Sequence, residues 1–238
     1  MPLPKPPVPT YELKVPSNDK TIKYRPFLVK EEKVLLIALE SQDEKQIENA
    51  VLDILKSCIL TKGIKVEDLA IFDIEYIFLK IRSKSVGEVV SMKVTCLDDN
   101  ETVVDYELNL DQVEVQKPEG HTSKIDLGEG MGMVLKYPGI NQFVSTQIVG
   151  KDLTATEIFD TIVDSVHQIY TADEIFEAKT TPRKELVDYV DSLTTKNFEQ
   201  IQEFFNTMPK LSHSFKVENP KTGVESEYTI EGLANFFG

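Results

Sequence analysis

The side chains that could carry out chemistry are few and stand far apart in the sequence. The three histidines, His121, His167 and His213, have no metal-ligand spacing and no H-E-x-x-H pattern, and His167 falls on a predicted helix. The two cysteines, Cys58 and Cys96, form no C-x-x-C motif, so we predict two reduced thiols rather than a metal or redox site. We therefore predict no catalytic, cofactor-binding or metal-binding residue among these five side chains.

Two short stretches could in principle bind an ion. Glycines stand at positions 128, 130 and 132, but they lack the G-x-G-x-x-G spacing and a strand-like sequence follows them. Glu129 lies between them and would repel phosphate, so we predict a tight β-turn. The loop from Asp98 to Glu101 could hold a cation. It lacks the glycine and the terminal glutamate of an EF-hand, and a solvated loop is the prediction.

Composition limits the classes of partner. The chain has 238 residues, of which 41% are hydrophobic and 28% charged, as is usual for a globular protein. Its net charge of −14 argues against nucleic acid and against anionic membrane surfaces, because both are bound by clusters of Lys and Arg. The N-terminus has no long apolar region of the kind found in secretory signals. We predict no nucleic acid, no membrane and no small-molecule substrate as partner.

The N-terminal 25 residues are predicted to form an extended proline-rich arm. Prolines at positions 2, 4, 6, 7 and 9 exclude a packed helix or a central strand, and they reduce the entropy cost of docking on a neighbour. After these prolines, the arm contains two short extended pieces, at 11–15 and 22–24. At the other end, two phenylalanines either cap the protein's own core or anchor in a partner's pocket. The predicted partner contacts are Pro4, Pro6, Pro7, Pro9, Tyr11, Arg25, Phe27, Phe236 and Phe237.

Residues 26–82 are predicted to form a compact helical unit. A first helix spans Lys30–Glu40, and a capping box over Ser41–Glu44 begins a second helix. The third helix, Val66–Lys84, is apolar nearly all round and should be the buried centre of the core.

The remaining sequence alternates between strand and helix patterns. Hairpins are predicted at 88–110 and 124–136, and a third closes the chain at 215–230. Between them, helices are predicted from 154 to 169, from 184 to 193 and around 198–205, with capping boxes at Thr154–Glu157 and Thr171–Glu174 and a Thr181–Pro182 start signal. The predicted fold class is α+β, with an N-terminal helical unit, central antiparallel β-hairpins, and C-terminal helices with a terminal β-hairpin. The predicted domains are 1–25, 26–150 and 151–238.

Two stretches of the chain carry a family resemblance. One lies near the start and the other near the end, and they comprise Tyr11–Leu13, Pro16–Ser17 and Arg25–Glu40, then Asn197–Pro209, Asn219–Gly223 and Gly232–Phe237. They resemble the ends of the baseplate hub proteins of T-even-like contractile-tailed bacteriophages, and the middle of the chain is similar more loosely. The hairpin tips here lack paired cysteines, so a bound zinc ion is not predicted.

The resemblance implies a non-enzymatic structural component or assembly factor of the tail baseplate hub, with other baseplate hub proteins as partners. Its location would be the virion tail baseplate, and the host cytoplasm during assembly. An alternative is a transient assembly chaperone for hub proteins that is absent from the mature virion. A third hypothesis, a metal-assisted hydrolase that uses the acidic loops, would need a metal or a carboxylate pair in a pocket. We predict that the protein is not an enzyme, and the sequence makes no prediction of its oligomeric state.

Overall fold

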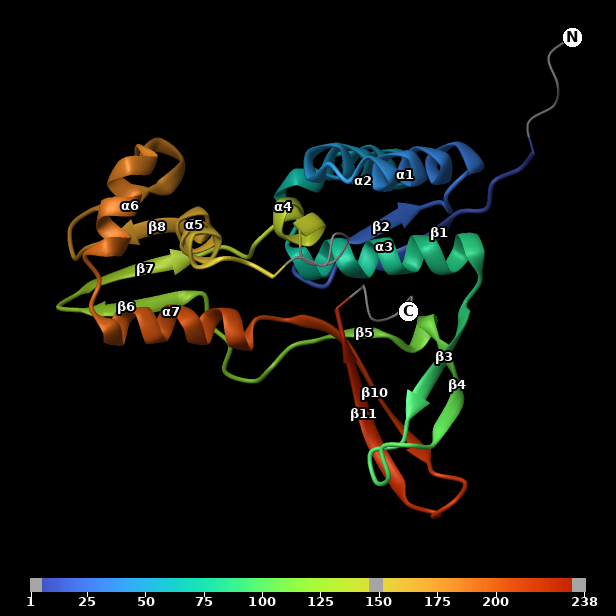
Figure 1. Cartoon of the computed structure of the whole chain (residues 1–238). Helices are drawn as coiled ribbons and strands as arrows, with labels where there is room; N and C mark the ends of the chain where they lie inside the picture. Colours follow the sequence, from blue (N-terminus) through green and yellow to red (C-terminus); the bar gives the residue numbers. More distant parts are fainter. Residues whose placement is uncertain (1–5, 146–151, 233–238) are drawn as a thin grey trace, which may run out of the picture.

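The chain forms two lobes and a pair of projecting hairpins (Figure 1). The structure is a computed structural model that describes residues 6–145 and 152–232. Helices and antiparallel sheets are mixed, and the predicted α+β class is confirmed. The described strands form four separate sheets, ordered β1-β2, β11-β10-β5, β3-β4 and β6-β7-β8-β9.

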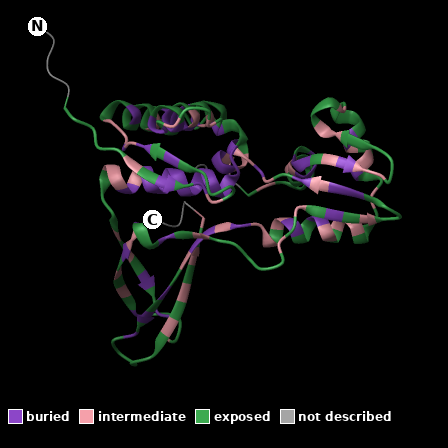
Figure 2. Cartoon of the chain, turned by 180° about the vertical axis from the view of Figure 1, so that it is seen from behind, coloured by how far each residue is buried: buried purple, intermediate pink, exposed green. Residues whose placement is uncertain are grey.

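The larger lobe is built around α3 (Ile71–Val86), which is apolar nearly all round. Twelve of its sixteen residues are buried, and Figure 2 shows the helix purple along most of its length. The prediction of a buried central helix is confirmed, but the helix begins at Ile71 rather than Val66. Val66–Asp68 is a 3-10 turn, and extended residues follow it because the amide of Ile71 donates to the carbonyl of Pro138 at 2.7 Å. No helix within residues 6–145 and 152–232 has the length and hydropathy to cross a bilayer.

Short elements surround this central helix. They are β1 (Tyr11–Lys14), β2 (Thr21–Tyr24), α1 (Val29–Ser41), α2 (Glu44–Cys58) and α4 (Ile140–Phe143). The hairpin β1–β2 belongs to the lobe, because Leu13, Val15, Ile22 and Tyr24 are buried in its core. Of the predicted arm, Pro6 to Thr10 are exposed and have no regular secondary structure.

The helix α1 departs from the prediction of a buried helical unit. Its only buried residues are Glu31 and Ala38, and Figure 2 shows the outer side of the α1–α2 pair in green. The predicted capping box at Ser41 is also wrong. Gln42 adopts a left-handed conformation with φ 55°, so the helix restarts later, and Asp43 caps α2 by accepting from the amides of Lys45 and Gln46.

The smaller lobe is a four-stranded antiparallel sheet covered by helices. Its elements are β6 (Lys124–Gly128), β7 (Met131–Leu135), α5 (Ala155–Ser165), β8 (Val166–Tyr170), β9 (Ile175–Glu177), α6 (Arg183–Asp191) and α7 (Thr195–Thr207). Their buried side chains form a core separate from that of the larger lobe. The capping box predicted at Thr154 is confirmed.

Three predictions in this lobe are wrong at the level of secondary structure. The helix predicted to reach Ile169 ends at Ser165, because Val166–Tyr170 pairs with β7 instead. The supposed capping box at Thr171 is the turn between β8 and β9, where the Thr171 hydroxyl accepts from the amides of Asp173 and Glu174. The residue at the N-cap of α6 is Pro182 rather than Thr181. A short hydroxyl side chain binds free backbone amides in a turn as readily as at a helix start, so the local pattern does not distinguish the two.

The projecting hairpins come from two distant parts of the chain. β3 (Val89–Thr95) pairs with β4 (Val103–Asn109), and β10 (Lys210–Glu218) pairs with β11 (Glu225–Glu231). They lie side by side over a small core of Val94, Phe215 and Val217, and we call them the pillar. A short strand, β5 (Glu114–Gln116), joins the start of β10 to the larger lobe. Segments on both sides of residue 150 therefore share the smaller lobe and the pillar.

A buried ammonium connects α3 to the segment by which the chain leaves β4 of the pillar. Lys80 is 6% exposed, and its Nζ donates to the carbonyls of Leu110, Asp111 and Val113 at 3.1, 3.0 and 3.2 Å. These carbonyls belong to the 3-10 turn Leu110–Gln112 and to the residue just after it. Lys80 thus supplies three donors to a partly buried turn, and burial lowers the pKa of its ammonium.

Replacing this ammonium should destabilise the fold. The substitution Lys80→Met retains the apolar stem but removes the ammonium donor from three carbonyls in or beside the core, and we expect a loss of about 2–4 kcal/mol in the free energy of unfolding. Urea denaturation followed by circular dichroism measures the loss. Lys56→Met is the matched control, because Lys56 is a half-exposed lysine paired with Glu67 and its loss should cost less than about 1 kcal/mol. Equal losses in the two variants would contradict the role given to Lys80.

Candidate interaction site

The three histidines occupy three different environments. His121 is half-buried where the lobes meet, His167 is exposed on β8 rather than on a helix, and His213 stacks near Phe215 in the pillar. Within the described ranges, no three His, Cys, Asp or Glu side chains gather into a group that could hold a metal ion.

His121 links the two lobes through both of its ring nitrogens. Nδ1 lies 3.0 Å from the Thr207 hydroxyl, and Nε2 lies 2.9 Å from the Tyr137 hydroxyl. The Thr207 hydroxyl donates its proton to the carbonyl of Glu203, so it accepts from Nδ1–H. Nε2 then accepts from Tyr137, and the geometry favours a neutral imidazole. His121, Tyr137 and Phe204 also stack, with ring centroids 5.2–5.6 Å apart.

The two thiols are structural. Cys58 is fully buried and its Sγ lies 3.9 Å from the carbonyl of Pro26, and burial raises its pKa to about 11. Cys96 is buried at the base of the pillar tip, and burial raises its pKa as well. Both side chains are therefore protonated at neutral pH, in the form that is unreactive as a nucleophile.

The glycine cluster is a tight turn, as predicted. Gly128, Glu129 and Gly130 have φ values of 88°, 53° and 76°, in the left-handed region that favours glycine. Gly132 is required for a different reason, because a Cβ there would lie 2.3 Å from the Tyr170 hydroxyl oxygen. The turn joins β6 to β7 and serves the sheet.

The acidic loop predicted to be solvated is the locked end of the pillar. Asp98 accepts from the side-chain amide of Asn219 at 3.0 and 3.1 Å and from the hydroxyl of Thr222 at 2.5 Å. These bonds connect the tip of β3–β4 to the tip of β10–β11 and hold the pKa of Asp98 below its usual value. The neighbouring Asp99 closes its own loop by accepting from Thr102, which also lowers its pKa.

Aromatic contacts stiffen the rest of the pillar. The Tyr228 hydroxyl donates to the carbonyl of Thr95 and accepts from the amide of Leu97, both at 3.0 Å. Phe215 stacks on Tyr106 with ring centroids 4.1 Å apart. Leu97 and Val224 remain 56% and 46% exposed at the locked end. The arrangement therefore presents two apolar side chains on a rigid projection.

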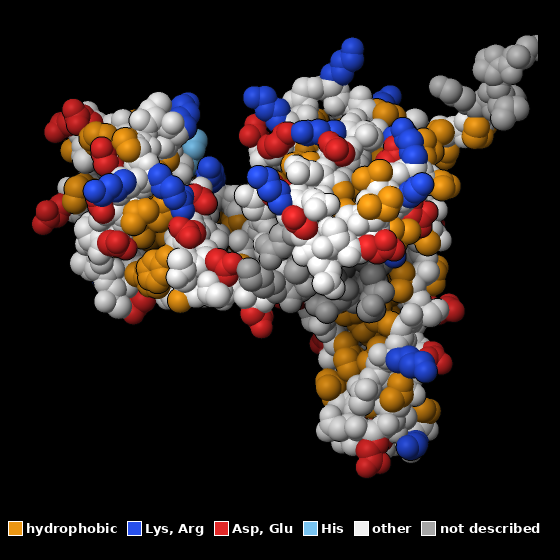
Figure 3. All heavy atoms as spheres, turned by 45° about the horizontal axis from the view of Figure 1, so that its top comes forward, with side chains coloured by type: hydrophobic (Ala, Val, Ile, Leu, Met, Phe, Trp, Pro, Cys, Tyr) orange, Lys and Arg blue, Asp and Glu red, His pale blue; other side chains and the backbone are white. Residues whose placement is uncertain are grey.

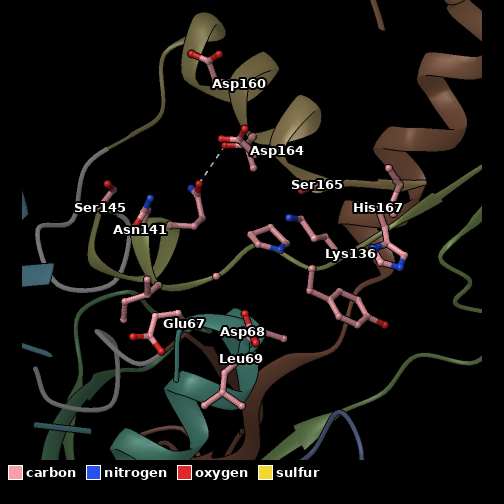
Figure 4. A pocket seen from close by; sticks show the side chains of 18 of the residues that line it. Glu67, Asp68, Leu69, Lys136, Asn141, Ser145, Asp160, Asp164, Ser165 and His167 are labelled. Carbon is pink, nitrogen blue, oxygen red and sulfur yellow. Dashed lines mark hydrogen bonds between the residues drawn. The ribbon is translucent and has the colours of Figure 1, made fainter. Parts of the chain in front are cut away.

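A cleft of about 880 Å³ lies between the two lobes (Figure 4). Glu67 and Asp68 line one wall, and Asp160 and Asp164 line the other. Arg183 forms ion pairs with both Asp160 and Asp164, and Lys56 pairs with Glu67. Three of these four acids are thus engaged with cations of the chain itself.

The predicted partner contacts fall into three groups. Pro6, Pro7 and Pro9 lie on the exposed N-terminal segment, whereas Pro4, Phe236 and Phe237 lie outside the described residues. Tyr11, Arg25 and Phe27 are half-buried in the larger lobe. They contact Tyr24, Glu31 and Phe78 respectively, with the Arg25 Nη2 to Glu31 Oε1 distance at 2.9 Å. The structure does not bring the six described residues together as one site.

The sequence predicted exposed hairpin tips as contact surfaces, but it missed two features that the structure presents. The first is the set of bonds that joins the two tips, which depends on a contact between residues more than 120 positions apart and leaves no local signal. The second is the exposed side of α1. Here the sequence carries a signal, because the run Val34–Leu39 contains six consecutive apolar residues and no helix can place all of them on one face.

One comparison with known proteins identifies a family. A family model described as T4 bacteriophage base plate protein matches residues 8–238, nearly the whole chain. No curated protein and no solved structure matches the chain.

The joint at His121 should make stability depend on pH. Burial lowers the pKa of His121 below its usual 6.5, so the folded protein favours the neutral ring. The contribution of His121 to the free energy of unfolding is fully present above pH 6.5. It is lost as the pH falls from 6.5 toward the lower pKa of the folded state. We expect the melting temperature to fall less between pH 7 and pH 5 in His121→Gln than in the wild type. His167→Gln, the same change on an exposed strand position, should follow the wild type, and identical profiles for all three proteins would contradict the proposed joint.

Proposed function

This chain belongs to the T4 bacteriophage base plate protein family, and on that basis we propose that it is a non-enzymatic part of the phage tail baseplate hub. Membership of the family supports a structural role in the baseplate. The narrower proposal is that the protein acts through contacts with other baseplate hub proteins, in the virion tail and, during assembly, in the host cytoplasm. It rests on the surfaces that the fold presents.

The pillar is the observation that carries the proposal. It projects from the larger lobe (Figure 1), and the Asp98 and Tyr228 bonds hold its two hairpins together. A rigid projection loses little conformational entropy when a partner binds it, so its contacts translate efficiently into affinity. The exposed Leu97 and Val224 suit an apolar socket on a partner, since buried apolar anchors dominate most interfaces.

The side chains that could take part in catalysis support a structural rather than a catalytic role. His121 joins the lobes, Asp98 locks the pillar, and Cys58 is buried against Pro26. Each of these groups has a partner within the chain and a structural consequence for the fold. We therefore propose that the protein is not an enzyme.

A transient chaperone of hub assembly is the alternative function. The rigid tip fits either role, because a chaperone and a permanent subunit both need a preformed contact surface. Mass spectrometry of purified virions distinguishes the two. We expect the protein to be detected in virions together with the other hub proteins, and its presence in infected cells but absence from virions would favour the chaperone.

Charged residues at the pillar tip should disrupt assembly without unfolding the protein. We expect the double variant Leu97→Glu/Val224→Glu to reduce co-purification with hub proteins from infected cells about tenfold or more, because an apolar anchor contributes about 2 kcal/mol to binding. The melting temperature should not change, since both side chains are exposed. Ile175→Glu is the matched control, because Ile175 is 65% exposed on β9 in the smaller lobe. Normal co-purification of the tip variant would refute the proposed contact.

The proline-rich arm is proposed to dock on a hub partner. Its described part, Pro6 to Thr10, is exposed and contributes nothing to the buried cores. Deletion of residues 1–9 should therefore leave the melting temperature unchanged and weaken assembly, measured by the same co-purification. A chain with Pro6, Pro7 and Pro9 replaced by Gly keeps the length of the arm but loses its stiffness. This variant separates the contribution of the arm's length to assembly from that of its stiffness. If the truncated protein assembles normally, the arm is not a docking element.

A further inference from the structure

The outer side of α1 carries apolar residues that the fold does not cover. Val29 is 82% exposed, and Leu36 and Ile37 are each 55% exposed. At 100° per residue these three lie on one arc of the helix together with Lys33 and Glu40, and Ala38 and Glu31 lie on the opposite arc. We call these five residues the outer face of α1.

The helix is attached to its lobe by few apolar contacts, those of Ala38 and of the half-buried Leu35. Arg25 pairs with Glu31, whose side chain is 7% exposed, and Glu31 also accepts from the amide of Leu28 at 2.8 Å. Ala38 is its only buried apolar residue. Helices on protein surfaces normally turn their apolar side inward, so this arrangement is typical of an interface. Figure 3 shows hydrophobic side chains among the charged ones over the larger lobe.

We propose that the outer face of α1 packs against the same face of a second copy of this chain. The two helices run antiparallel, and a two-fold axis passes between Leu36 and Ile37. The central contact is then Leu36 of each protomer against Ile37 of its partner. Such an interface is self-complementary, as two-fold symmetry requires.

The charges on this face favour a second copy of the chain as the binding partner. In the antiparallel arrangement, Lys33 and Glu40 lie at equal distances on either side of the axis, because each is three residues from the central pair. Lys33 of one protomer therefore meets Glu40 of the other, and the symmetry repeats this pair. The same arrangement brings no like charges together along the face.

The long-range charge of the chain opposes this contact but does not prevent it. Each copy has a net charge of −14. At physiological ionic strength the Debye length is about 8 Å, so repulsion between distant groups is screened while the two contact pairs are retained. The dimer should therefore be stable in about 0.15 M salt and weaken as salt is removed.

Analytical ultracentrifugation of the full-length chain tests the proposal. We expect a concentration-dependent dimer for the wild type and a monomer for Leu36→Glu/Ile37→Glu. Lys33→Glu places two glutamates opposite each other at both ends and should raise the dissociation constant about tenfold. The double change Lys33→Glu/Glu40→Lys exchanges the partners and should restore the wild-type value.

The controls separate this interface from the pillar and from misfolding. Leu97→Glu alters an equally exposed residue at the pillar tip, and it should dimerise like the wild type. The circular dichroism spectrum should be the same for every variant as for the wild type, since all the altered side chains are exposed. A wild type that stays monomeric up to its solubility limit would overturn the proposal, as would a double charge exchange that fails to restore the dimer.

Discussion

The buried ammonium of Lys80 is the interaction on which the arrangement of the chain depends. It lies on the most buried helix, α3, and holds the turn that leads from β4 into β5. Because β5 pairs with β10, the same contact also sets where the pillar leaves the larger lobe. A lysine is costly to bury, and its three carbonyl partners offset that cost only when the turn is in place. The core and the projection are therefore coupled.

A second joint connects the lobes through one aromatic side chain. Tyr137 packs edge-on against Phe72 of α3 and stacks on Phe204 of α7, with ring centroids 4.9 and 5.4 Å apart. It also hydrogen-bonds to His121. Two cores that share one ring keep a defined relative position, and the cleft beside it follows from that geometry. This position in turn leaves the pillar and α1 pointing away from both cores, where partners can reach them.

The sequence predicted most of the helices and strands but not all of their boundaries or long-range contacts. The central helix, the hairpins and the α+β class were predictable because each has a strong local period. The end of α5 was not, because Val166 to Ile169 suits a helix or a strand equally and pairing with β7 decides. Asp98 is exposed, as predicted, but its bonds to Asn219 and Thr222 could not be predicted, because these partners are far away in sequence. The exposed side of α1 was signalled by its six-residue apolar run, which exceeds what one face can bury.

By itself, the sequence determined the local structure and the family. Periodicity and composition act over a few residues, and they specified a buried central helix, exposed N-terminal prolines and an acidic surface. The amino-acid sequence near the two ends of the chain resembled baseplate proteins, and the family match over residues 8–238 agrees. Only the tertiary structure decided how β3–β4 and β10–β11 combine into one pillar and which side of α1 stays uncovered. Those outcomes depend on contacts between distant segments, whose free energy is gained only when the whole chain has folded.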